Sequence, residues 1–194
     1  SGEVILPLAL AFTSNCCTFA SASPSSLAKV VDETGATEIH PYNNFHVIAG
    51  QGDRTALIYD SAMTGQVRKY TYAEMQDHIS KFAGVLNAKG VKKGDRVLLY
   101  MPMIPEAVIA MLACARIGAI HTVVFGGFAS NELAKRIIDA EPKIIVSATC
   151  GLEPGRVIAY KPLLDEALAI SKSTAKTIIV KRPECDAELI DGRD

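Results

Sequence analysis

Hydrophobic and polar residues follow regular patterns only from about Gly52 onward. Residues 1–50 contain an apolar run and a Ser/Ala/Pro-rich stretch without a sustained period, so we expect an irregular N-terminal extension there. Beyond it, short apolar runs alternate with segments in which apolar residues recur every three or four positions. The short runs predict strands and the spaced segments predict helices. The predicted strands are Thr55–Tyr59, Val67–Tyr70, Arg96–Tyr100, Ile120–Val124, Lys143–Ser147 and Thr177–Val180.

Helices are expected after most of these strands, and the first has clear signals at both ends. Thr71 followed by Glu74 forms a capping box, and Gly90 followed by Val91 fits a left-handed stop. Between these signals, apolar side chains fall on one helical face. They are Tyr72, Met75, Ile79, Phe82 and Leu86. Further helices are expected over Glu106–Ile117, from Ser130 as the cap to Ala140, and around Leu163–Ile170.

Strands that alternate with helices of this length indicate βαβ units and a parallel sheet. The later strands are short, continuous and aliphatic, as expected when helices cover both faces of a sheet. The sequence therefore predicts an α/β fold: a doubly wound, mostly parallel sheet with helices on both faces. We expect residues 1–50 to be an extension and residues 51–194 to form the folded part.

The predicted fold indicates where a ligand site would lie. All strand-to-helix loops of a parallel sheet emerge at its carboxyl edge, where ligands bind in crevices. Three loops share this edge: Met101–Ile104, Phe125–Phe128 and Thr149–Arg156. In the second loop, Gly126 and Gly127 either allow the backbone to approach a ligand closely or permit a tight turn.

Arg156 is the candidate phosphate ligand of this edge. It follows the turn residues Glu153, Pro154 and Gly155, and its guanidinium could hold two phosphate oxygens at once. Alternatively, Arg156 pairs with the nearby Glu153 or faces water. The residue spacing does not decide between these interpretations.

Composition and motifs exclude several classes of protein. Twenty Lys and Arg against 21 Asp and Glu give a net charge of -1, without the basic excess of a nucleic-acid-binding protein. The chain contains neither a GxGxxG fingerprint nor a GxxxxGK[ST] loop. The four histidines have no metal-ligand spacing, and His121, at the start of a predicted strand, is expected to be structural.

The cysteines and the N-terminal apolar run give information about the cellular compartment of the protein. Five cysteines without a CxxC pair argue against a disulfide framework and favour a reducing, intracellular environment. Val4–Phe12 is too short to span a bilayer as a helix. It is either the apolar part of a secretory signal, with Ala20-Ser21-Ala22 as a cleavage pattern, or a buried strand or trimmed presequence. Glu3 is acidic where a secretory signal requires positive charge.

Four segments carry a resemblance to a known family. They are GDRTALIYDS (Gly52–Ser61), YMPMIPEAVIAMLACARIGAIH (Tyr100–His121), VFGGFASNELAKRI (Val124–Ile137) and EPKIIVSATCGLEPGR (Glu141–Arg156). Together with the closing Gly192-Arg193-Asp194, they resemble the N-terminal domain of short-chain acyl-CoA synthetases of the acetyl/propionyl type, in the adenylate-forming superfamily. Residues 51–194 are thus expected to be part of an AMP-binding-enzyme domain.

The resemblance implies a two-step reaction and a set of ligand contacts. Such enzymes use ATP and Mg²⁺ to activate acetate or propionate as an acyl-adenylate, and coenzyme A then takes the acyl group. The resemblance places the ribose-phosphate and adenine end of coenzyme A at Glu153, Pro154, Gly155 and Arg156. Phe125, Gly126 and Gly127 are expected to lie close to the same ligand.

The sequence departs from the family pattern at Glu153, and several functional elements of the family lie outside the matched region. Many acetyl-CoA synthetases have a second arginine where this chain has Glu153, and the Glu-Pro-Gly-Arg version suits the propionyl-preferring, mitochondrial branch. The family's phosphate loop, acyl pocket and catalytic lysine lie downstream of this region, so we expect the chain to be inactive alone. The alternative is a non-enzymatic interaction module or short isoform that self-associates through an uncovered apolar face.

Overall fold

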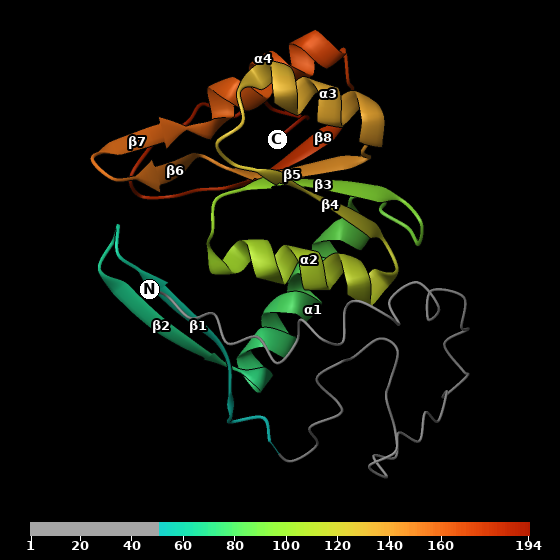
Figure 1. Ribbon diagram of the computed structural model, residues 1–194. Helices are drawn as coiled ribbons and strands as arrows, with labels where there is room; N and C mark the ends of the chain where they lie inside the picture. The colour runs from blue at the N-terminus through green and yellow to red at the C-terminus, as the bar shows by residue number, and fades with distance from the viewer. Residues whose placement is uncertain (1–50) are drawn as a thin grey trace.

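The structure, a computed structural model, describes residues 51–194, which form a sheet between two layers of helices (Figure 1). The expected N-terminal extension, the apolar run and the possible cleavage pattern lie outside the described residues. The elements in chain order are β1 (Thr55–Ser61), β2 (Gln66–Thr71), α1 (Tyr72–Ala88), β3 (Arg96–Met101), α2 (Pro105–Ile117), β4 (Ile120–Phe125), α3 (Ser130–Ala140), β5 (Ile144–Ala148), β6 (Cys150–Glu153), β7 (Arg156–Ala159), α4 (Tyr160–Ser171) and β8 (Lys176–Val180).

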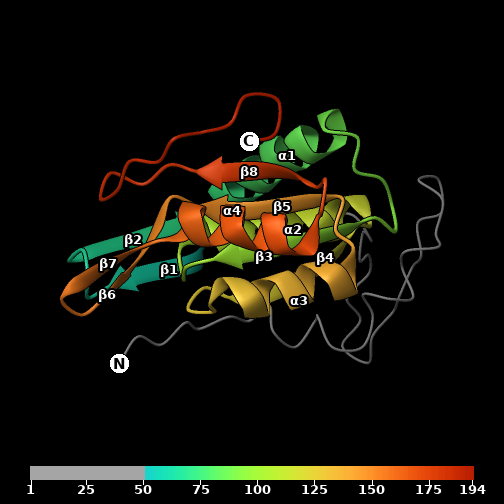
Figure 2. The same ribbon diagram turned by 90° about the horizontal axis from the view of Figure 1, so that it is seen from above.

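The central sheet confirms the predicted α/β class. Its four parallel strands run in the order β4-β3-β5-β8. Helices α1 and α2 cover one face and α3 and α4 the other (Figures 1 and 2). The chain builds outward from β3 to β4 and then crosses to β5 on the other side of β3. This reversal makes a switch point between β3 and β5, and crevices at such points are the usual ligand sites of open α/β sheets.

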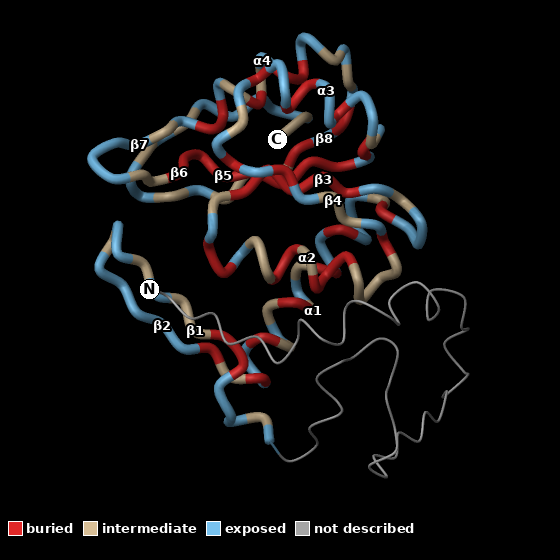
Figure 3. The backbone as a smooth tube through the Cα atoms, in the orientation of Figure 1, coloured by how far each residue is buried: buried red, intermediate tan, exposed pale blue. Residues whose placement is uncertain are grey.

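Alternating side chains of the inner strands divide the core into two halves. Val97 and Leu99 of β3 pack with α1 and α2, whereas Leu98 and Tyr100 pack with α3 and α4; all four are at most 1% exposed. The buried positions follow the sheet and the inner sides of the helices (Figure 3). This two-sided burial explains why the strands read as continuous apolar runs.

The first two predicted strands, β1 and β2, pair as an antiparallel hairpin that precedes α1. The capping box at the start of α1 is present: the Glu74 backbone N–H donates to Thr71 Oγ1 at 3.2 Å, and the Thr71 N–H donates to the Glu74 carboxylate at 2.7 Å. At the other end, the Val91 N–H donates to the Leu86 carbonyl at 3.0 Å, and Gly90 has φ 85°. This is the predicted Schellman arrangement.

Three local predictions were wrong. Ser130 does not cap α3; it is the first helical residue, and its hydroxyl donates to Glu166 of α4 at 2.6 Å. Helix α4 begins at Tyr160 rather than near Leu163. The helix tolerates Pro162 because this residue falls in the first turn, where a backbone N–H has no helical partner. The predicted loop Thr149–Arg156 is largely a hairpin, described below.

The closing segment returns to the sheet and inserts a carboxylate beside α4. The side chain of Asp194 is 0% exposed and that of Lys161 is 3% exposed, and they pair at 3.1 Å. Asp194 also accepts from the Thr177 hydroxyl, from Arg193 Nε at 2.8 Å and from the Ile190 N–H at 2.7 Å. Asp165 pairs with Lys161 at 2.7 Å and with Arg193 at 2.5 Å. Two cations and two carboxylates therefore neutralise each other where the segment meets α4 and β8.

Candidate functional site

The carboxyl edge of the sheet carries a rim made from two separate stretches of chain. Phe125 ends β4 and leads into Gly126 and Gly127, while Thr149 leads from β5 into the β6–β7 hairpin. The hairpin projects from this edge beyond the sheet (Figure 1). The loops that the sequence assigned to one edge do lie on one edge.

The hairpin fixes how Glu153 and Arg156 face each other. Its register pairs Cys150 with Ala159 and Glu153 with Arg156, leaving Pro154 and Gly155 as the turn. Gly155 has φ 75°, and a proline followed by such a glycine is the sequence that a type II turn requires. The sequence indicates the turn but not the strands on either side of it, which are only four residues each.

Arg156 and Glu153 form an ion pair at the tip of the hairpin. Arg156 Nε and Nη2 donate to one Glu153 carboxylate oxygen at 2.8 and 2.5 Å. Their side chains are 68% and 40% exposed. An exposed pair of this kind contributes about 0–1 kcal/mol, so a phosphate could displace the carboxylate at little cost. The structure thus shows the pairing that the sequence left open, in a form that a charged ligand can exchange.

Tyr160 joins the hairpin to the glycine loop. Its ring is 5% exposed and stacks on Tyr100, with centroids 4.9 Å apart. A Cβ atom built at Gly126 would lie 2.2 Å from the Tyr160 hydroxyl oxygen, and one built at Gly151 would lie 2.5 Å from it. The Tyr100 hydroxyl donates to the Phe128 carbonyl at 2.9 Å, which holds the far end of the glycine loop.

These contacts give a packing reason for the glycines, separate from the turn and from the approach of a ligand. Neither Gly126 nor Gly127 has a positive φ, so the turn does not need glycine for its backbone angles. Gly126 is required because Tyr160 occupies the space of a side chain. A Cβ at Gly127 would lie 2.6 Å from the Phe125 ring, but that ring is 69% exposed and can move aside, so the requirement for glycine is weaker there. Sequence reasoning missed Tyr160 and Gly151, whose proximity to Gly126 has no sequence signal.

The β4 side of the rim is apolar and exposed. Phe125 is 69% exposed and meets Phe128 edge-on, with centroids 5.9 Å apart, and Met103 in the neighbouring loop is 84% exposed. Arg182, another residue that sequence reasoning missed, lies at the base of the hairpin and donates to the Cys150 carbonyl at 3.2 Å. The Arg182 side chain is 10% exposed and also pairs with Glu184 at 3.4 Å, so it serves the hairpin rather than a ligand. The rim thus offers aromatic surface at one end and the exposed Arg156 guanidinium at the other, a combination suited to a flat base that carries phosphate.

The titratable groups beneath the rim favour binding rather than covalent chemistry. Burial raises the pKa of Tyr100 to about 12, and burial also raises the pKa of Tyr160, so both phenols remain protonated at neutral pH. Burial likewise raises the pKa of the Cys150 thiol, which disfavours the nucleophilic thiolate. Within residues 51–194, no three His, Cys, Asp or Glu side chains gather as a metal site. No helix in this range is long and apolar enough to cross a bilayer.

Comparison with protein families shows which family contains this chain. Residues 45–193 match the family described as AMP-binding enzyme. The chain belongs to this family. The resemblance noted in the sequence is therefore confirmed, and it concerns the N-terminal portion of acyl-CoA synthetases.

Individual relatives show which AMP-binding enzymes this chain is similar to. The chain is 52% identical over 151 residues to the mitochondrial acyl-CoA synthetase short-chain family member 3 of Rattus norvegicus, covering 77% of this chain and 22% of the relative. It is 48% identical over 149 residues to an acetyl-coenzyme A synthetase of Streptomyces avermitilis, covering 77% of this chain and 23% of the relative. The chain thus spans less than a quarter of the length of these curated relatives.

A solved structure supports the fold alone. The crystal structure of an acyl-CoA synthetase from Brucella canis superposes with a TM-score of 0.57 at 22% identity, covering 72% of this chain and 24% of that chain. The likeness agrees with the parallel four-stranded sheet flanked by helices.

Proposed function

We propose that this chain is the N-terminal portion of a short-chain acyl-CoA synthetase and that its rim binds the phosphorylated nucleotide end of coenzyme A. The observation that supports the proposal is that the Tyr160 hydroxyl lies against both Gly126 of the glycine loop and Gly151 of the hairpin that ends in the Glu153–Arg156 turn. The relatives named above, an acyl-CoA synthetase and an acetyl-coenzyme A synthetase, agree with it.

The proposed ligand fits the chemistry of the rim. The Arg156 guanidinium would exchange Glu153 for the ribose phosphate of coenzyme A, and the exposed Phe125 ring would offer a face to the adenine. Base–aromatic stacking contributes about 1–3 kcal/mol in nucleic-acid binding, which indicates the scale of that contact. The Glu153 carboxylate repels phosphate, so Arg156 would release this carboxylate before it binds the phosphate.

The reaction of the whole enzyme is part of the same proposal. Acetate or propionate attacks the α-phosphorus of ATP, which forms an acyl-adenylate and releases pyrophosphate; the coenzyme A thiol then displaces AMP to give the thioester. We assign ATP and Mg²⁺ to the whole enzyme and only the coenzyme A rim to this chain, which we expect to be inactive alone. We further propose propionate as a substrate and the mitochondrial matrix as the location, because of the Glu153-Pro154-Gly155-Arg156 sequence and a relative named as mitochondrial.

Arg156→Ala is expected to weaken coenzyme A binding about tenfold, the loss of roughly one charge-assisted hydrogen bond. Isothermal titration calorimetry of the chain with coenzyme A measures this. Dephospho-coenzyme A lacks the ribose 3′-phosphate and should bind the unmodified chain as weakly as coenzyme A binds the variant. Arg136→Ala, which removes the same charge from the exposed side of α3, is the matched control and should bind normally. Absence of binding heat with the unmodified chain, or equal binding by the Arg156 variant, would reject the rim as the site.

A second candidate function, a self-associating interaction module, has one observation in its favour. Strand β4 is an edge of the central sheet, and three of its apolar side chains are exposed: Ile120 by 55%, Val123 by 59% and Phe125 by 69%. An exposed apolar edge strand is a template for pairing with another chain. A second copy of this chain could add its own β4 there.

Val123→Lys is expected to reduce self-association through this edge, because a lysine on an edge strand opposes strand pairing. Static light scattering of the chain across a concentration series measures the average mass. Val85→Lys changes an exposed valine on α1 in the same way and should leave the mass unchanged. A monomeric unmodified chain at every concentration would contradict the module.

A further inference from the structure

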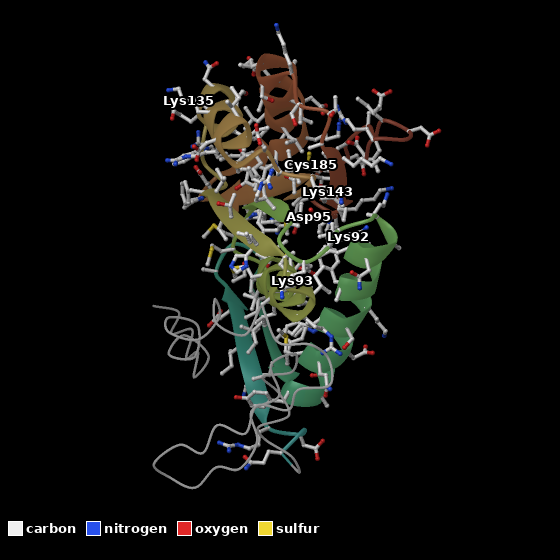
Figure 4. The ribbon with its side chains drawn as sticks, turned by 90° about the vertical axis from the view of Figure 1, so that its right-hand side faces the viewer. Lys92, Lys93, Asp95, Lys135, Lys143 and Cys185 are labelled. Atoms are coloured by element: carbon white, nitrogen blue, oxygen red, sulfur yellow. The ribbon has the colours of Figure 1, made fainter. Side chains whose placement is uncertain are left out.

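The amino edge of the sheet, opposite the rim, contains a hollow of about 630 Å³. It opens where the ends of α3 and α4 turn into β5 and β8, next to the end of α1. Figure 4 shows this side of the molecule, with Lys143, Asp95, Lys92 and Lys93 grouped at its centre. The polar residues that line the hollow are Lys89, Glu141, Lys143, Ser171, Lys172, Ser173, Thr174 and Lys176.

The lining has an excess of positive charge. It contains four lysines and one carboxylate, Glu141. Glu141 lies 3.6 Å from Arg96, and Lys143 pairs with Asp95 at 2.7 Å. Within the described part of the chain, no carboxylate lies within 4.0 Å of the other three lysines. They are Lys89, Lys172 and Lys176.

Helix ends account for only part of this charge, because Lys89 ends α1 and Lys172 ends α4, whereas Lys176 begins β8. The carbonyl end of a helix attracts cations, so lysines there can simply balance the helix dipole. At the end of α3, however, Arg96 already donates to the carbonyls of Ala140 and Glu141 at 2.8 and 3.0 Å. At the end of α4, the Leu168 carbonyl accepts from the Ser171 hydroxyl at 3.2 Å. Lys176 lies at no helix end, and no carboxylate among residues 51–194 pairs with Lys89, Lys172 or Lys176, so a ligand can reach their ammonium groups.

Backbone geometry distinguishes two of the residues that line the hollow. Among residues 51–194, the residues other than glycine with positive φ are Glu141 at 43° and Lys172 at 53°. Both line the hollow, and both end a helix, at a position where glycine is favoured. Such strained positions concentrate at functional sites. Here a side chain is kept where glycine would fit the backbone better.

We propose that this hollow binds a compact, multiply charged phosphate group, with Lys172 and Lys176 as its principal ligands. Lys89 adds charge from α1, and the hydroxyls of Ser173 and Thr174 add hydrogen-bond donors within the same turn. The site is separate from the coenzyme A rim and does not depend on the function proposed for that rim. Phosphate clusters of this kind occur on free metabolites and on lipid headgroups.

Inorganic tripolyphosphate is the probe, because it carries the clustered phosphate charge that free metabolites and lipid headgroups share. Isothermal titration should show saturable binding to the unmodified chain and at least tenfold weaker binding to Lys172→Gln/Lys176→Gln. Glu141→Gln should bind more tightly, because it removes the lining carboxylate. Lys135→Gln removes one lysine from the outer side of α3, where Lys135 is paired with Glu132, and should bind normally. Figure 4 shows Lys135 apart from the lysines at the centre of this side.

Flotation with phosphatidylcholine vesicles, with and without phosphatidylinositol bisphosphate, distinguishes the two sources. Lysine-dependent capture only by the phosphoinositide vesicles would identify a lipid headgroup, and no capture would identify a soluble phosphate compound. The proposal is overturned if tripolyphosphate does not bind saturably, or if Lys135→Gln weakens binding as much as the double variant does. Thermal melts of each variant confirm that it is folded before titration.

Discussion

Asp194→Ala is expected to lower the free energy of unfolding by about 3–5 kcal/mol, the typical loss when one partner of a buried ion pair is removed. The substitution removes one of the two carboxylates that face Lys161, which is 3% exposed, and leaves Asp165 alone to balance Lys161 and Arg193. It also deprives the Thr177 hydroxyl and the Ile190 N–H of their acceptor. Urea denaturation followed by circular dichroism measures the change. Asp186→Ala removes an exposed carboxylate from the same closing segment and should change the stability by less than about 0.5 kcal/mol.

The effect of Asp194→Ala should also depend on pH. Burial acts to raise the pKa of Asp194, but hydrogen bonds from Arg193, Ile190, Thr177 and Lys161 outweigh it and hold the pKa below its ordinary value. The stabilisation is therefore complete above the ordinary carboxyl pKa of about 4 and is lost as the pH falls toward the lowered value. The stability difference between the variant and the unmodified chain should shrink on acidification. A difference that stays constant down to about pH 2 would show that the carboxylate charge contributes nothing.

Gly126→Ala is expected to lower the free energy of unfolding by about 1–3 kcal/mol, the usual cost of overpacking. The added methyl group would meet the Tyr160 hydroxyl oxygen at 2.2 Å and the ring at 2.8 Å. The ring cannot move aside easily, because it is buried and stacked on Tyr100. Chemical denaturation measures this change as well.

A matched control and a double-mutant cycle separate this clash from a general effect of replacing glycine. Gly84 lies in α1 with open space around its missing side chain, so Gly84→Ala should stabilise the chain by about 0.5–1 kcal/mol. In the Tyr160→Phe background, Gly126→Ala should cost less, because the closest contact is gone. Equal costs in both backgrounds would show that Tyr160 is not what requires glycine there.

The features predicted well from the sequence are those in which one local signal controls one local structure. The capping box at Thr71 and the stop at Gly90 define the ends of α1 without help from the rest of the fold. The aliphatic runs of β3 and β5 indicate two-sided burial, which is what the parallel sheet provides. The common carboxyl edge then follows from the strand direction alone, so the positions of Gly126 and Arg156 could be anticipated.

The features that were missed depend on contacts between distant residues. Ser130 resembles a helix cap, but its hydroxyl is used by Glu166, which is 36 positions away. The strands β6 and β7 are too short to show alternation, and only their pairing makes them strands. The role of Gly126 depends on Tyr160, a partner that no local pattern connects with it. Tertiary partners therefore decide the details of the rim, while local signals decide where the rim lies.

The length of the central strands keeps the rim proposed for coenzyme A and the lysine-lined hollow apart. Strands β3 and β5 have six and five residues. At about 3.3 Å per residue, they separate the two edges by roughly 17–20 Å. This exceeds the Debye length of about 8 Å at physiological ionic strength, so charge bound at one edge is largely screened from the other. The two proposed sites would therefore bind their anions independently, each with an affinity set by its own edge.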